Sequence, residues 1–448
     1  MSKSRKIPAF RALVLCLIAA SLPAAFGAGA PAGPSARISG GREQEAGPSL
    51  SLLEQLYKEN RCFELRDAVA SLKAAPGSDE EFYLGAVDNV FNRLDSAIAR
   101  LQSYLDAGRA AGRDRPLDKQ AWILLADSYR RSGRYKRSAE VQWLILERFG
   151  SGLDAAEKTN RQSQSVLWSA VADVPPQTIE LQGESVIAME NRTFPVRIKD
   201  RDFFFSYDTG ASLSVLYQSA AEELGLPLLG EGIKIESGTG RWIGARLAVA
   251  PELRLGRAVV RNAVFLVLPD DFFPVRQVRP GVVRRGLIGA PVLVALKEFT
   301  ETRDGRLIIP ASPRPRPVQN MFFYGTKPIT EPVYQGARLR FFVDTGSSET
   351  FLYPPFFRRY RDEIQSRSTL RESKMGGVGG ERTVPMHILD EFAFQAGGRR
   401  LSLKKIVVHT QATHSITETF DGTLGRDVLI PCSRMTFNFE SMSFILEE

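Results

Sequence analysis

The sequence repeats itself with a period of 136 residues, and this duplication limits the possible folds more than any other feature. An apolar run ending in Asp-Thr-Gly occurs at Phe203–Leu213 (FFFSYDTGASL) and again at Phe341–Phe351 (FFVDTGSSETF). At average residue usage of ~5–7%, about 0.1 copies of Asp-Thr-Gly would arise by chance in a chain of this length. Two copies at matched positions therefore indicate two related halves.

Further glycines keep the same spacing from the two aspartates, Asp208 and Asp344. Two glycines and then the glycine of an apolar-apolar-Gly segment follow each aspartate, at intervals that are identical in the two copies. These glycines are Gly240, Gly244 and Gly289 in the first copy and Gly376, Gly380 and Gly425 in the second. Each copy closes with a predicted strand, turn and strand, at Glu298–Ile309 and Met435–Leu446, and the Pro/Arg-rich stretch Ala311–Pro317 joins the copies.

A single Asp-Thr-Gly would be weak support for function, because Asp and Gly are also good turn residues. The matched spacing of the other glycines makes a shared functional role the better interpretation. Beyond Pro175 the sequence changes to short β-branched and aromatic runs separated by Gly and turn residues. This pattern predicts an all-β region.

The region before it, residues 49–172, has apolar residues at helical spacing. Within it, Ala121–Phe149 resembles a tetratricopeptide repeat in the positions of Trp122, Leu125, Ala126, Tyr129, Gly133, Tyr135 and Ala139, and an earlier run resembles a second copy. Small residues at Gly85, Ala97 and Ala126 would let paired helices approach closely. Such a helical array either presents a concave surface to a partner or packs on the neighbouring domain, and the sequence leaves both uses open.

The first thirty residues have the layout of a secretory signal peptide: basic residues, the apolar run Ala12–Ala20, and then small residues. We therefore expect export, to the periplasm or the cell exterior, and regard a retained membrane anchor as the less favoured alternative. Residues 31–48 are rich in Pro, Gly and charge and are predicted to be a flexible linker. Without the signal, Cys62 and Cys432 remain in different predicted domains, so at most one disulfide can form and two unrelated buried thiols are expected.

The composition and the absence of other motifs argue against several other functions. The net charge is +8, but the basic residues are scattered in short groups and form no stripe interleaved with aromatics, which argues against nucleic-acid binding. The three histidines, His387, His409 and His414, have no HExxH helix or carboxylate cluster with them, so we predict exposed histidines and no metal site. There is no G-x-S-x-G nucleophile elbow and no P-loop.

With these motifs in place, each half resembles a retropepsin, the retroviral-type aspartic protease, and the pair resembles the two lobes of a pepsin-like enzyme. The resemblance covers about 270 of the 448 residues. It implies an α + β multidomain chain in which an N-terminal α-helical repeat array precedes a bilobal all-β aspartic protease. The predicted boundaries are 1–30 signal peptide, 31–48 linker, 49–172 helical domain, 176–310 first lobe, 311–319 linker and 320–448 second lobe.

The resemblance also implies the roles of individual residues. Asp208 and Asp344 would hold one water molecule between them and share one proton, and which of them is charged stays open. Thr209 and Thr345 would bond across the facing loops, while Gly210, Gly346 and Ser347 would support the carboxylates. Gly289 and Gly425 would support the catalytic loops from behind. No metal or cofactor is needed, and the partner would be a peptide or protein substrate.

Two hairpin flaps are expected to close over an extended peptide, at Gly238–Gly244 and Gly376–Gly380. Their glycines are Gly238, Gly240, Gly244, Gly376 and Gly380. Trp242 lies in the first flap and would either line a substrate pocket or pack internally. The short linker between the copies favours pairing of the two lobes within one chain, and therefore a monomer, over pairing between two chains.

Two departures from the family pattern matter. Ser206 and Tyr207 interrupt the apolar approach to the first aspartate. Ala211 follows the first Asp-Thr-Gly where Ser347 follows the second, so one hydroxyl that could bond an ionised carboxylate is missing, and we expect a milder pH optimum than with Ser in both loops. The competing hypothesis is a non-catalytic exported scaffold that binds a peptide or protein through protease-like lobes.

Overall fold

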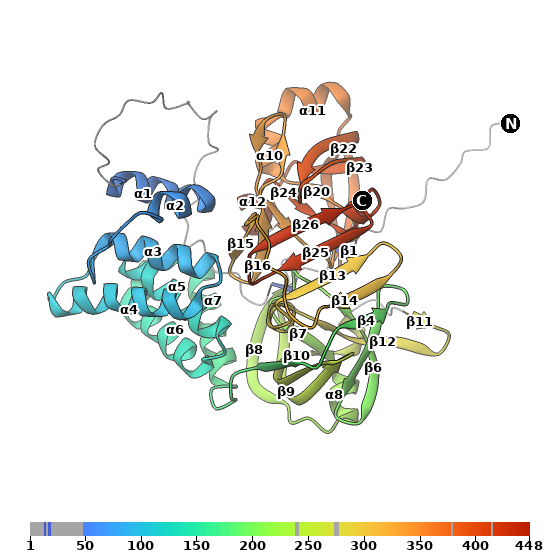
Figure 1. Ribbon diagram of the computed structural model, residues 1–448, viewed down its shortest axis with the longest axis horizontal. Coiled ribbons are helices and arrows are strands. Elements are labelled where there is room, and N and C mark those ends of the chain that lie inside the picture. Colours follow the sequence, from blue (N-terminus) through green and yellow to red (C-terminus); the bar gives the residue numbers. More distant parts are fainter. Residues whose placement is uncertain are drawn as a thin grey trace.

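The computed structural model describes residues 13–14, 17–18, 48–237, 242–272, 277–377, 380–413 and 415–448. Most of the predicted signal peptide and nearly all of the predicted linker lie outside these residues. A group of helices, coloured blue to teal, stands beside a larger β-rich body coloured green to red (Figure 1). This arrangement confirms the predicted order, a helical region followed by a β-rich one.

The helical region consists of successive short helices. They are α1 (Leu50–Lys58), α2 (Cys62–Val69), α3 (Asp79–Val90), α4 (Leu94–Ala110), α5 (Asp118–Arg131), α6 (Tyr135–Phe149), η1 (Gly150–Gly152) and α7 (Ala155–Ser169). Ser78 caps α3 by accepting the Glu81 N–H at 3.4 Å. A Cβ on Gly85 would lie 3.0 Å from Leu101 Cγ, so α3 and α4 pack closely because residue 85 has no side chain. Among the described residues, no helix has the length and apolar character to cross a membrane.

The first half of the β-rich body covers residues 178–309. Its elements are β3 (Thr178–Leu181), β4 (Ser185–Ala188), β5 (Phe194–Ile198), β6 (Arg201–Tyr207), β7 (Ser214–Tyr217), α8 (Gln218–Glu223), β8 (Leu229–Ser237), β9 (Trp242–Leu255), β10 (Ala258–Leu268), η2 (Asp270–Phe272), β11 (Gln277–Arg279), β12 (Val282–Ile288), α9 (Ala290–Ala295), β13 (Glu298–Thr302) and β14 (Arg306–Ile309). The larger sheet of this half has the order β2-β8-β9-β5-β6-β12-β7-β10-β3, in which β2 is Leu17–Ile18, and β11 pairs with β12.

The second half covers residues 321–447. Its elements are β15 (Met321–Tyr324), β16 (Lys327–Thr330), β17 (Val333–Tyr334), β18 (Ala337–Arg338), β19 (Phe341–Val343), β20 (Phe351–Leu352), α10 (Pro354–Arg359), α11 (Arg361–Arg367), β21 (Arg371–Gly377), β22 (Gly380–Ala396), β23 (Arg399–His409), α12 (Ser415–Thr419), β24 (Gly422–Leu424), η3 (Arg426–Leu429), β25 (Arg434–Asn438) and β26 (Ser443–Glu447). The sheet order is β1-β21-β22-β23-β20-β24-β19-β16-β15, in which β1 is Leu13–Val14, and β17 pairs with β18 and β22.

The two halves share the arrangement that matters for the Asp-Thr-Gly turns. In the first half β12 pairs parallel with β6 and antiparallel with β7. In the second half β24 pairs parallel with β19 and antiparallel with β20. The strand before each Asp-Thr-Gly therefore lies beside the strand that ends in the apolar-apolar-Gly segment.

A five-stranded sheet of order β26-β25-β13-β14-β4 joins the halves. Its β13 and β25 are antiparallel, with Thr300 opposite Thr436 and their Oγ1 atoms 2.7 Å apart. These two threonines are 136 residues apart, one period of the repeat. Equivalent residues that face each other across an antiparallel pair mark an approximate two-fold axis, which therefore passes between these threonines.

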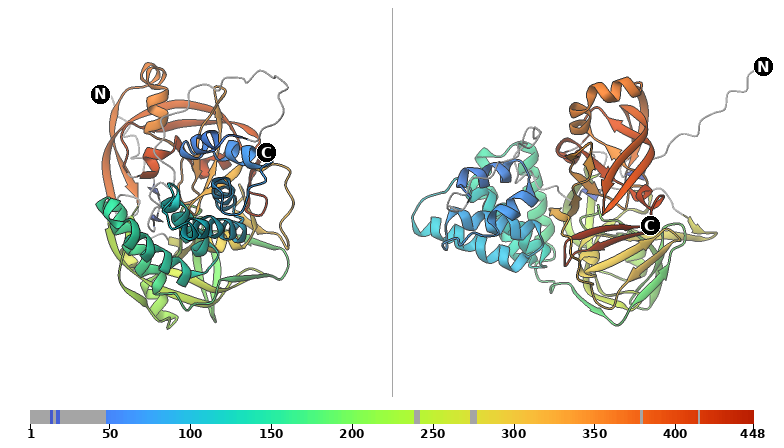
Figure 2. Two further views of the ribbon diagram at one scale, coloured as in Figure 1. Left: turned by 90° about the vertical axis from the view of Figure 1, so that its left-hand side faces the viewer. Right: turned by 45° about the horizontal axis from the view of Figure 1, so that its top comes forward.

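The helical region packs against both halves. Phe63 of α2 contacts Phe322 of β15 edge-on, with ring centroids 5.3 Å apart. Trp168 of α7 belongs to a buried apolar cluster that includes Ile233 and Ile235 of β8. Figure 2 shows the helices lying over one side of the β-rich body. Packing on the neighbouring region is thus one use of these helices.

The two cysteines outside the predicted signal peptide lie in different regions. Cys62 is the first residue of α2, and Cys432 lies between η3 and β25 in the second half. Both are buried and free, which confirms the prediction of two unrelated buried thiols.

Candidate active site

The two Asp-Thr-Gly turns begin where β6 and β19 end. The Asp208 N–H donates to the Ile288 carbonyl at 2.9 Å, and the Asp344 N–H donates to the Leu424 carbonyl at 2.9 Å. In each half, the aspartate is therefore anchored to the last residues of the neighbouring parallel strand. Both aspartates are fully buried.

The two carboxyl groups face each other across the turns. A Cβ added to Gly346 would collide with Asp208 Oδ2, and a Cβ added to Gly210 would lie 2.8 Å from Asp344 Oδ1. Each glycine thus lies against the carboxylate of the opposite half. Each also donates its N–H to the aspartate of its own turn, Gly210 to Asp208 Oδ1 at 2.7 Å and Gly346 to Asp344 Oδ1 at 2.9 Å. A side chain at either glycine would push the carboxylates apart.

The two threonines bond across the approximate two-fold axis. The Thr209 N–H donates to Thr345 Oγ1 at 3.0 Å, and the Thr345 N–H donates to Thr209 Oγ1 at 3.0 Å. Thr209 Oγ1 in turn donates to the Val343 carbonyl at 2.7 Å. These bonds are buried and fix the position of one turn relative to the other.

Burial and proximity change the acidity of this pair. Burial, followed by the charge of Asp344 and a hydrogen bond to it, raises the pKa of Asp208 well above its usual value. The Gly210 N–H and the positive charge of Lys327 oppose this rise in pKa. Two carboxylates in such contact cannot both ionise readily, so the pair retains one proton over a wide pH range.

Lys327 is a functional candidate that the sequence did not reveal. It is buried in the second half at the start of β16, yet its Nζ lies 3.5 Å from Ser212 Oγ, in the loop that follows Asp208. No motif surrounds this lysine in the sequence. The repeat gives no signal either, because the equivalent residue of the first half is Asn191.

The apolar-apolar-Gly glycines lie where no side chain fits. A Cβ on Gly289 would collide with the Leu213 carbonyl, and a Cβ on Gly425 would collide with the Glu349 carbonyl. Their N–H groups donate to Ser214 Oγ at 3.0 Å and to Thr350 Oγ1 at 3.1 Å, respectively. Both glycines therefore hold the loop that follows an aspartate against the end of the neighbouring strand.

Ser347 differs from its predicted role. Its hydroxyl donates to the Glu349 carbonyl at 2.7 Å, so its hydrogen is directed into its own loop and away from the carboxylate of Asp344. The prediction was wrong because a local hydrogen bond to the backbone satisfies the hydroxyl. The expected pH difference between a loop with Ala211 and one with Ser347 therefore loses its structural basis.

The predicted flaps are β-hairpins in the part of the chain that the structure describes. In the first, β8 and β9 pair Lys234 with Gly244 and Glu236 with Trp242. In the second, β21 and β22 pair Gly377 with Gly380. Gly238 and Gly240 lie outside the described residues. Gly376 lies in β21, one residue before the end of that strand.

The outer edges of both hairpins pair with the apolar run near the N-terminus. Residues 13–14 run parallel to β21, opposite Gly376 and Gly377. Residues 17–18 run antiparallel to β8, opposite Ser237 and Glu236. Each hairpin therefore offers an edge to an extended segment.

The histidines correct a second prediction. His387 and His409 are buried rather than exposed, because β22 and β23 place them among aromatic rings: Phe357 stacks on His387 at 5.4 Å, and Phe351 lies 5.6 Å from His409. Burial lowers the pKa of His409 to about 4. His414 lies outside the described residues. Within the described ranges, no group of three or more His, Cys, Asp or Glu residues is arranged to hold a metal ion.

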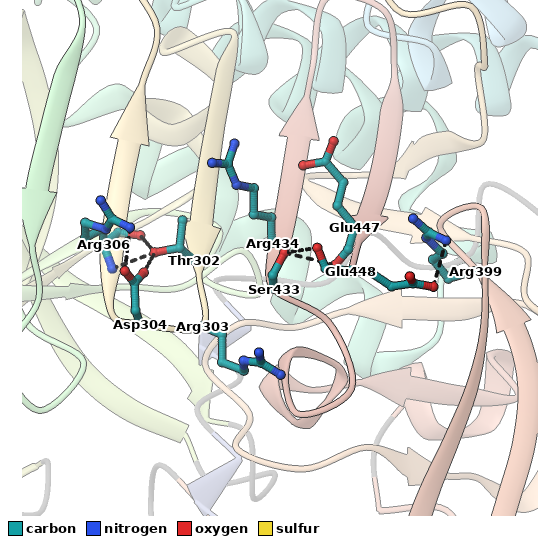
Figure 3. A pocket seen from close by; sticks show the side chains of 9 residues that line it. All are labelled: Thr302, Arg303, Asp304, Arg306, Arg399, Ser433, Arg434, Glu447 and Glu448. Atoms are coloured by element: carbon teal, nitrogen blue, oxygen red, sulfur yellow. Dashed lines mark hydrogen bonds and ion pairs between the residues drawn. The ribbon is translucent and has the colours of Figure 1, made fainter.

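A pocket of about 620 Å³ lies elsewhere, on the strands that join the halves (Figure 3). It is lined by Thr302, Arg303, Asp304, Arg306, Arg399, Ser433, Arg434, Glu447 and Glu448. Several of its charges already have partners, such as Arg399 with Glu448 at 2.9 Å. None of its residues belongs to the Asp-Thr-Gly turns or the hairpins, so this pocket is not part of the candidate site.

Comparison with known proteins gives a partial match. A family model described as Aspartyl protease matches residues 194–292, which include the first Asp-Thr-Gly turn and Gly289. A crystal structure of a retropepsin-like aspartic protease from Rickettsia conorii is similar at 22% sequence identity, over 30% of this chain and 91% of that chain, with a TM-score of 0.20. At this TM-score the likeness establishes no common overall fold. No curated protein matches the chain.

Proposed function

We propose that this protein is an aspartic endopeptidase in which Asp208 and Asp344 together hydrolyse peptide bonds. The observation that carries the proposal is the pair of buried, facing carboxyl groups held in cross-bonded turns. The family match to residues 194–292 supports it independently. The raised pKa of Asp208 supports a pair that holds one proton at working pH.

The chemistry follows from that single shared proton. The ionised carboxylate removes a proton from a water molecule held between the two groups, and the resulting oxygen nucleophile attacks the peptide carbonyl. The neutral carboxylic acid gives its proton to the carbonyl oxygen at the same time. The carboxyl group that took the water proton then passes a proton to the leaving nitrogen as the C–N bond breaks. The other carboxylate takes a proton from a hydroxyl of the tetrahedral intermediate as the new carbonyl forms, which regenerates one charged and one neutral carboxyl group.

The hairpins would bind the substrate as an added strand. The edges of β8 and β21 pair with the chain's own residues 17–18 and 13–14, respectively, and a substrate peptide can use the same backbone groups. Strand addition takes its affinity from main-chain hydrogen bonds, so the peptide must be extended around the cleaved bond. We propose that Trp242, the first residue of β9, contributes to peptide binding by the first hairpin.

The remaining features of the proposal concern the whole chain. The two halves would act as two lobes of one enzyme in a monomer, because the approximate two-fold axis relates equivalent residues of a single chain. The helices before them would form a tetratricopeptide-like array that recruits or orients a protein substrate. The apolar run near the N-terminus would direct export to the periplasm or the cell exterior.

Peptide-library cleavage between pH 3 and pH 8 tests the proposal, using the full chain and the Asp208→Asn and Asp344→Asn variants, with and without pepstatin. We expect cleavage that pepstatin inhibits and that either substitution abolishes. Retained cleavage in one variant would place the chemistry elsewhere. Absence of cleavage by the unmodified chain, with a library peptide still bound in a pull-down, would support the scaffold hypothesis instead.

A further inference from the structure

A buried polar cluster lies beside the Asp-Thr-Gly turns and takes part in no step of the chemistry above. The Tyr207 hydroxyl donates to Glu301 Oε2, and Arg426 Nε donates to the same oxygen at 3.0 Å. The Arg426 guanidinium carbon also lies 4.6 Å from the centre of the Tyr207 ring. All three residues are buried. We call this cluster the Tyr207–Glu301–Arg426 triad.

The triad connects the backbone segments that hold the two aspartates. Tyr207 is the last residue of β6 and immediately precedes Asp208. Arg426 lies in the other half, and its N–H donates at 3.1 Å to the Ser347 carbonyl, in the turn that carries Asp344. The glutamate between them lies on β13, next to the two-fold axis. A displacement at either end is therefore passed to an aspartate through one or two rigid links.

The other side of the two-fold axis has no such triad. One period of the repeat away from its members, the chain has Val343, Phe437 and Ala290, all apolar. Replacing a buried ion pair by well-packed apolar residues is often neutral or stabilising, because the pair must recover a large desolvation cost. The second copy shows that apolar residues occupy these equivalent positions in this chain. Stability alone thus gives no reason for a charged triad on one side.

We propose that the Tyr207–Glu301–Arg426 triad is a positioning unit, which fixes the separation of Asp208 and Asp344 and so controls how strongly they share their proton. The inference rests on the proposed function for its importance to catalysis. The predicted effect of the triad on the proton shared by the two carboxyl groups rests only on the geometry described above. Both the mutual repulsion of two carboxylates and their shared hydrogen bond weaken as they move apart.

Neighbouring charges also act on these groups and must be separated from the effect of distance. Glu301 faces Arg426 within the triad, and the half-buried Arg192 lies near both. Asp427 also faces Arg192, while the aspartate pair faces Lys327. Removing Glu301 or Arg426 alone would leave an unpaired buried charge, so neither single substitution is a clean test.

Tyr207→Phe is the clean variant, since it removes one hydroxyl and no charge. Burial and the charge of Glu301 raise the pKa of Tyr207 well above 10, so this side chain is neutral at every working pH. Tyr217→Phe is the matched control, because its hydroxyl is also buried in the first half and also bonds an arginine, accepting from Arg284 Nη2 at 2.8 Å.

The full chain and both variants are titrated by infrared difference spectroscopy of the protonated carboxyl band, assigned by its loss in Asp208→Asn. In Tyr207→Phe we expect the two apparent pKa values of the aspartate pair to move toward each other, the lower one rising and the higher one falling. For hydrolysis we expect kcat to fall about tenfold with little change in KM, a fraction of the ~100-fold that a 1 Å misplacement can cost. Tyr217→Phe should leave the titration unchanged.

The two readouts separate the two proposals. An unchanged carboxyl titration in Tyr207→Phe, with only a lower melting temperature, would overturn the positioning role. A changed titration in a chain that cleaves no peptide would uphold the positioning role and overturn the proposed function. A second variant that copies the opposite side, Tyr207→Val with Glu301→Phe and Arg426→Ala, should change the titration in the same direction. An unchanged titration there would also count against the role.

Discussion

The two halves of the β-rich body share a backbone plan but differ in the side chains behind their aspartates. Both place an aspartate after a central strand, a glycine against the opposite carboxylate, and a second glycine under the following loop. Behind the first aspartate, however, is a charged triad, whereas the equivalent residues on the other side of the two-fold axis are apolar. Symmetric backbones thus build the pair of carboxylates, whereas the side chains behind the pair are asymmetric.

The contacts that cross between the halves show the same pattern. Each half places a cation beside the loop that follows the other half's aspartate. Arg192 donates to Ser348 Oγ at 2.7 Å, and Lys327 Nζ lies 3.5 Å from Ser212 Oγ. The two serines are one period of the repeat apart, but the cations differ in type and burial. The lysine lowers the pKa of Asp208, the aspartate in the half that it contacts.

The largest expected effect tests the feature that both halves share. Asp208→Asn and Asp344→Asn should each reduce peptide hydrolysis by about 10³-fold or more, since each removes one partner of the acid–base pair. Initial rates with a cleaved library peptide check this. Circular dichroism of both variants should match the unmodified chain. A large difference in residual activity between the two would mean that only one half carries the chemistry.

The supporting glycines come next, and here the halves should behave alike. Gly289→Ala and Gly425→Ala each place a methyl group against a backbone carbonyl, so each should lower the free energy of unfolding by about 3 kcal/mol. Urea unfolding measures this. Gly244→Ala is the control, because a Cβ there meets no atom within 4 Å. Unequal losses at the two glycines would show that one half tolerates movement of its catalytic loop.

The third prediction concerns acid stability, where the halves should differ. His409 is buried and its pKa is lowered to about 4, so the unfolded chain binds the proton more readily than the folded chain. The stability that the neutral ring contributes is complete above pH 6.5 and is lost as the pH falls from 6.5 to about 4. His409→Phe, which replaces the titrating ring by one that cannot bind a proton, should recover up to about 3 kcal/mol at pH 4 and little at pH 8. The first half contains no histidine and should show no such slope.

Unfolding free energies of the unmodified chain and His409→Phe at several pH values check this slope. An equal difference at pH 4 and pH 8 would mean that the substitution acts through packing and that the histidine does not titrate in this range.

A smaller effect should distinguish the two cations. Lys327→Met removes a positive charge that lowers the pKa of Asp208, so the alkaline limb of the pH–rate profile should move upward by about one unit. Arg192→Met should move it less, because this arginine is only half-buried and contacts the loop that follows Asp344, not the loop that follows Asp208. Rates between pH 3 and pH 8 measure both. A downward shift in Lys327→Met would contradict the assigned direction.

The smallest expected effect concerns the hairpin edges. A peptide with the sequence of residues 11–20 should compete with a library substrate, with a KM or inhibition constant in the range of ~1 µM–1 mM. Replacing Val14 and Ile18 of the peptide by Pro removes two backbone N–H groups and should weaken competition at least tenfold. Equal competition by both peptides would show that strand pairing does not provide the binding.

The repeat in the sequence predicted the parts of this site that depend on the backbone. The turns and strands of this site pack so closely that only glycine fits at certain positions. Because both halves pack in the same way, these glycines and the Asp-Thr-Gly turns recur at the same spacing, which one sequence is enough to show. The Tyr207–Glu301–Arg426 triad leaves no such trace, since Glu301 and Arg426 are 125 residues apart and meet only across the sheet that joins the halves. Of the three residues, only Tyr207 stood out in the sequence, because it interrupts the apolar run before the first aspartate.

Side-chain direction explains the predictions that were wrong. Ser347 was predicted from its position in the motif, but its hydroxyl bonds a carbonyl two residues away, which the motif does not encode. His387 and His409 were predicted to be exposed because their residue type usually is. The β22 and β23 register places them on opposite faces of the sheet, since His387 is opposite Val408 and His409 is opposite Met386. Aromatic side chains cover both faces there, so both rings are buried whatever their residue type.

The approximate two-fold axis also has a consequence in time. A chain made from its N-terminus contains Asp208 long before Asp344, and at ~5–20 residues per second the interval of 136 residues corresponds to on the order of ten seconds of synthesis. During that interval the first aspartate has no partner carboxylate in its own chain. The hydrolytic activity that we propose for the pair would therefore begin late in folding, after the second copy has been made and has docked on the first.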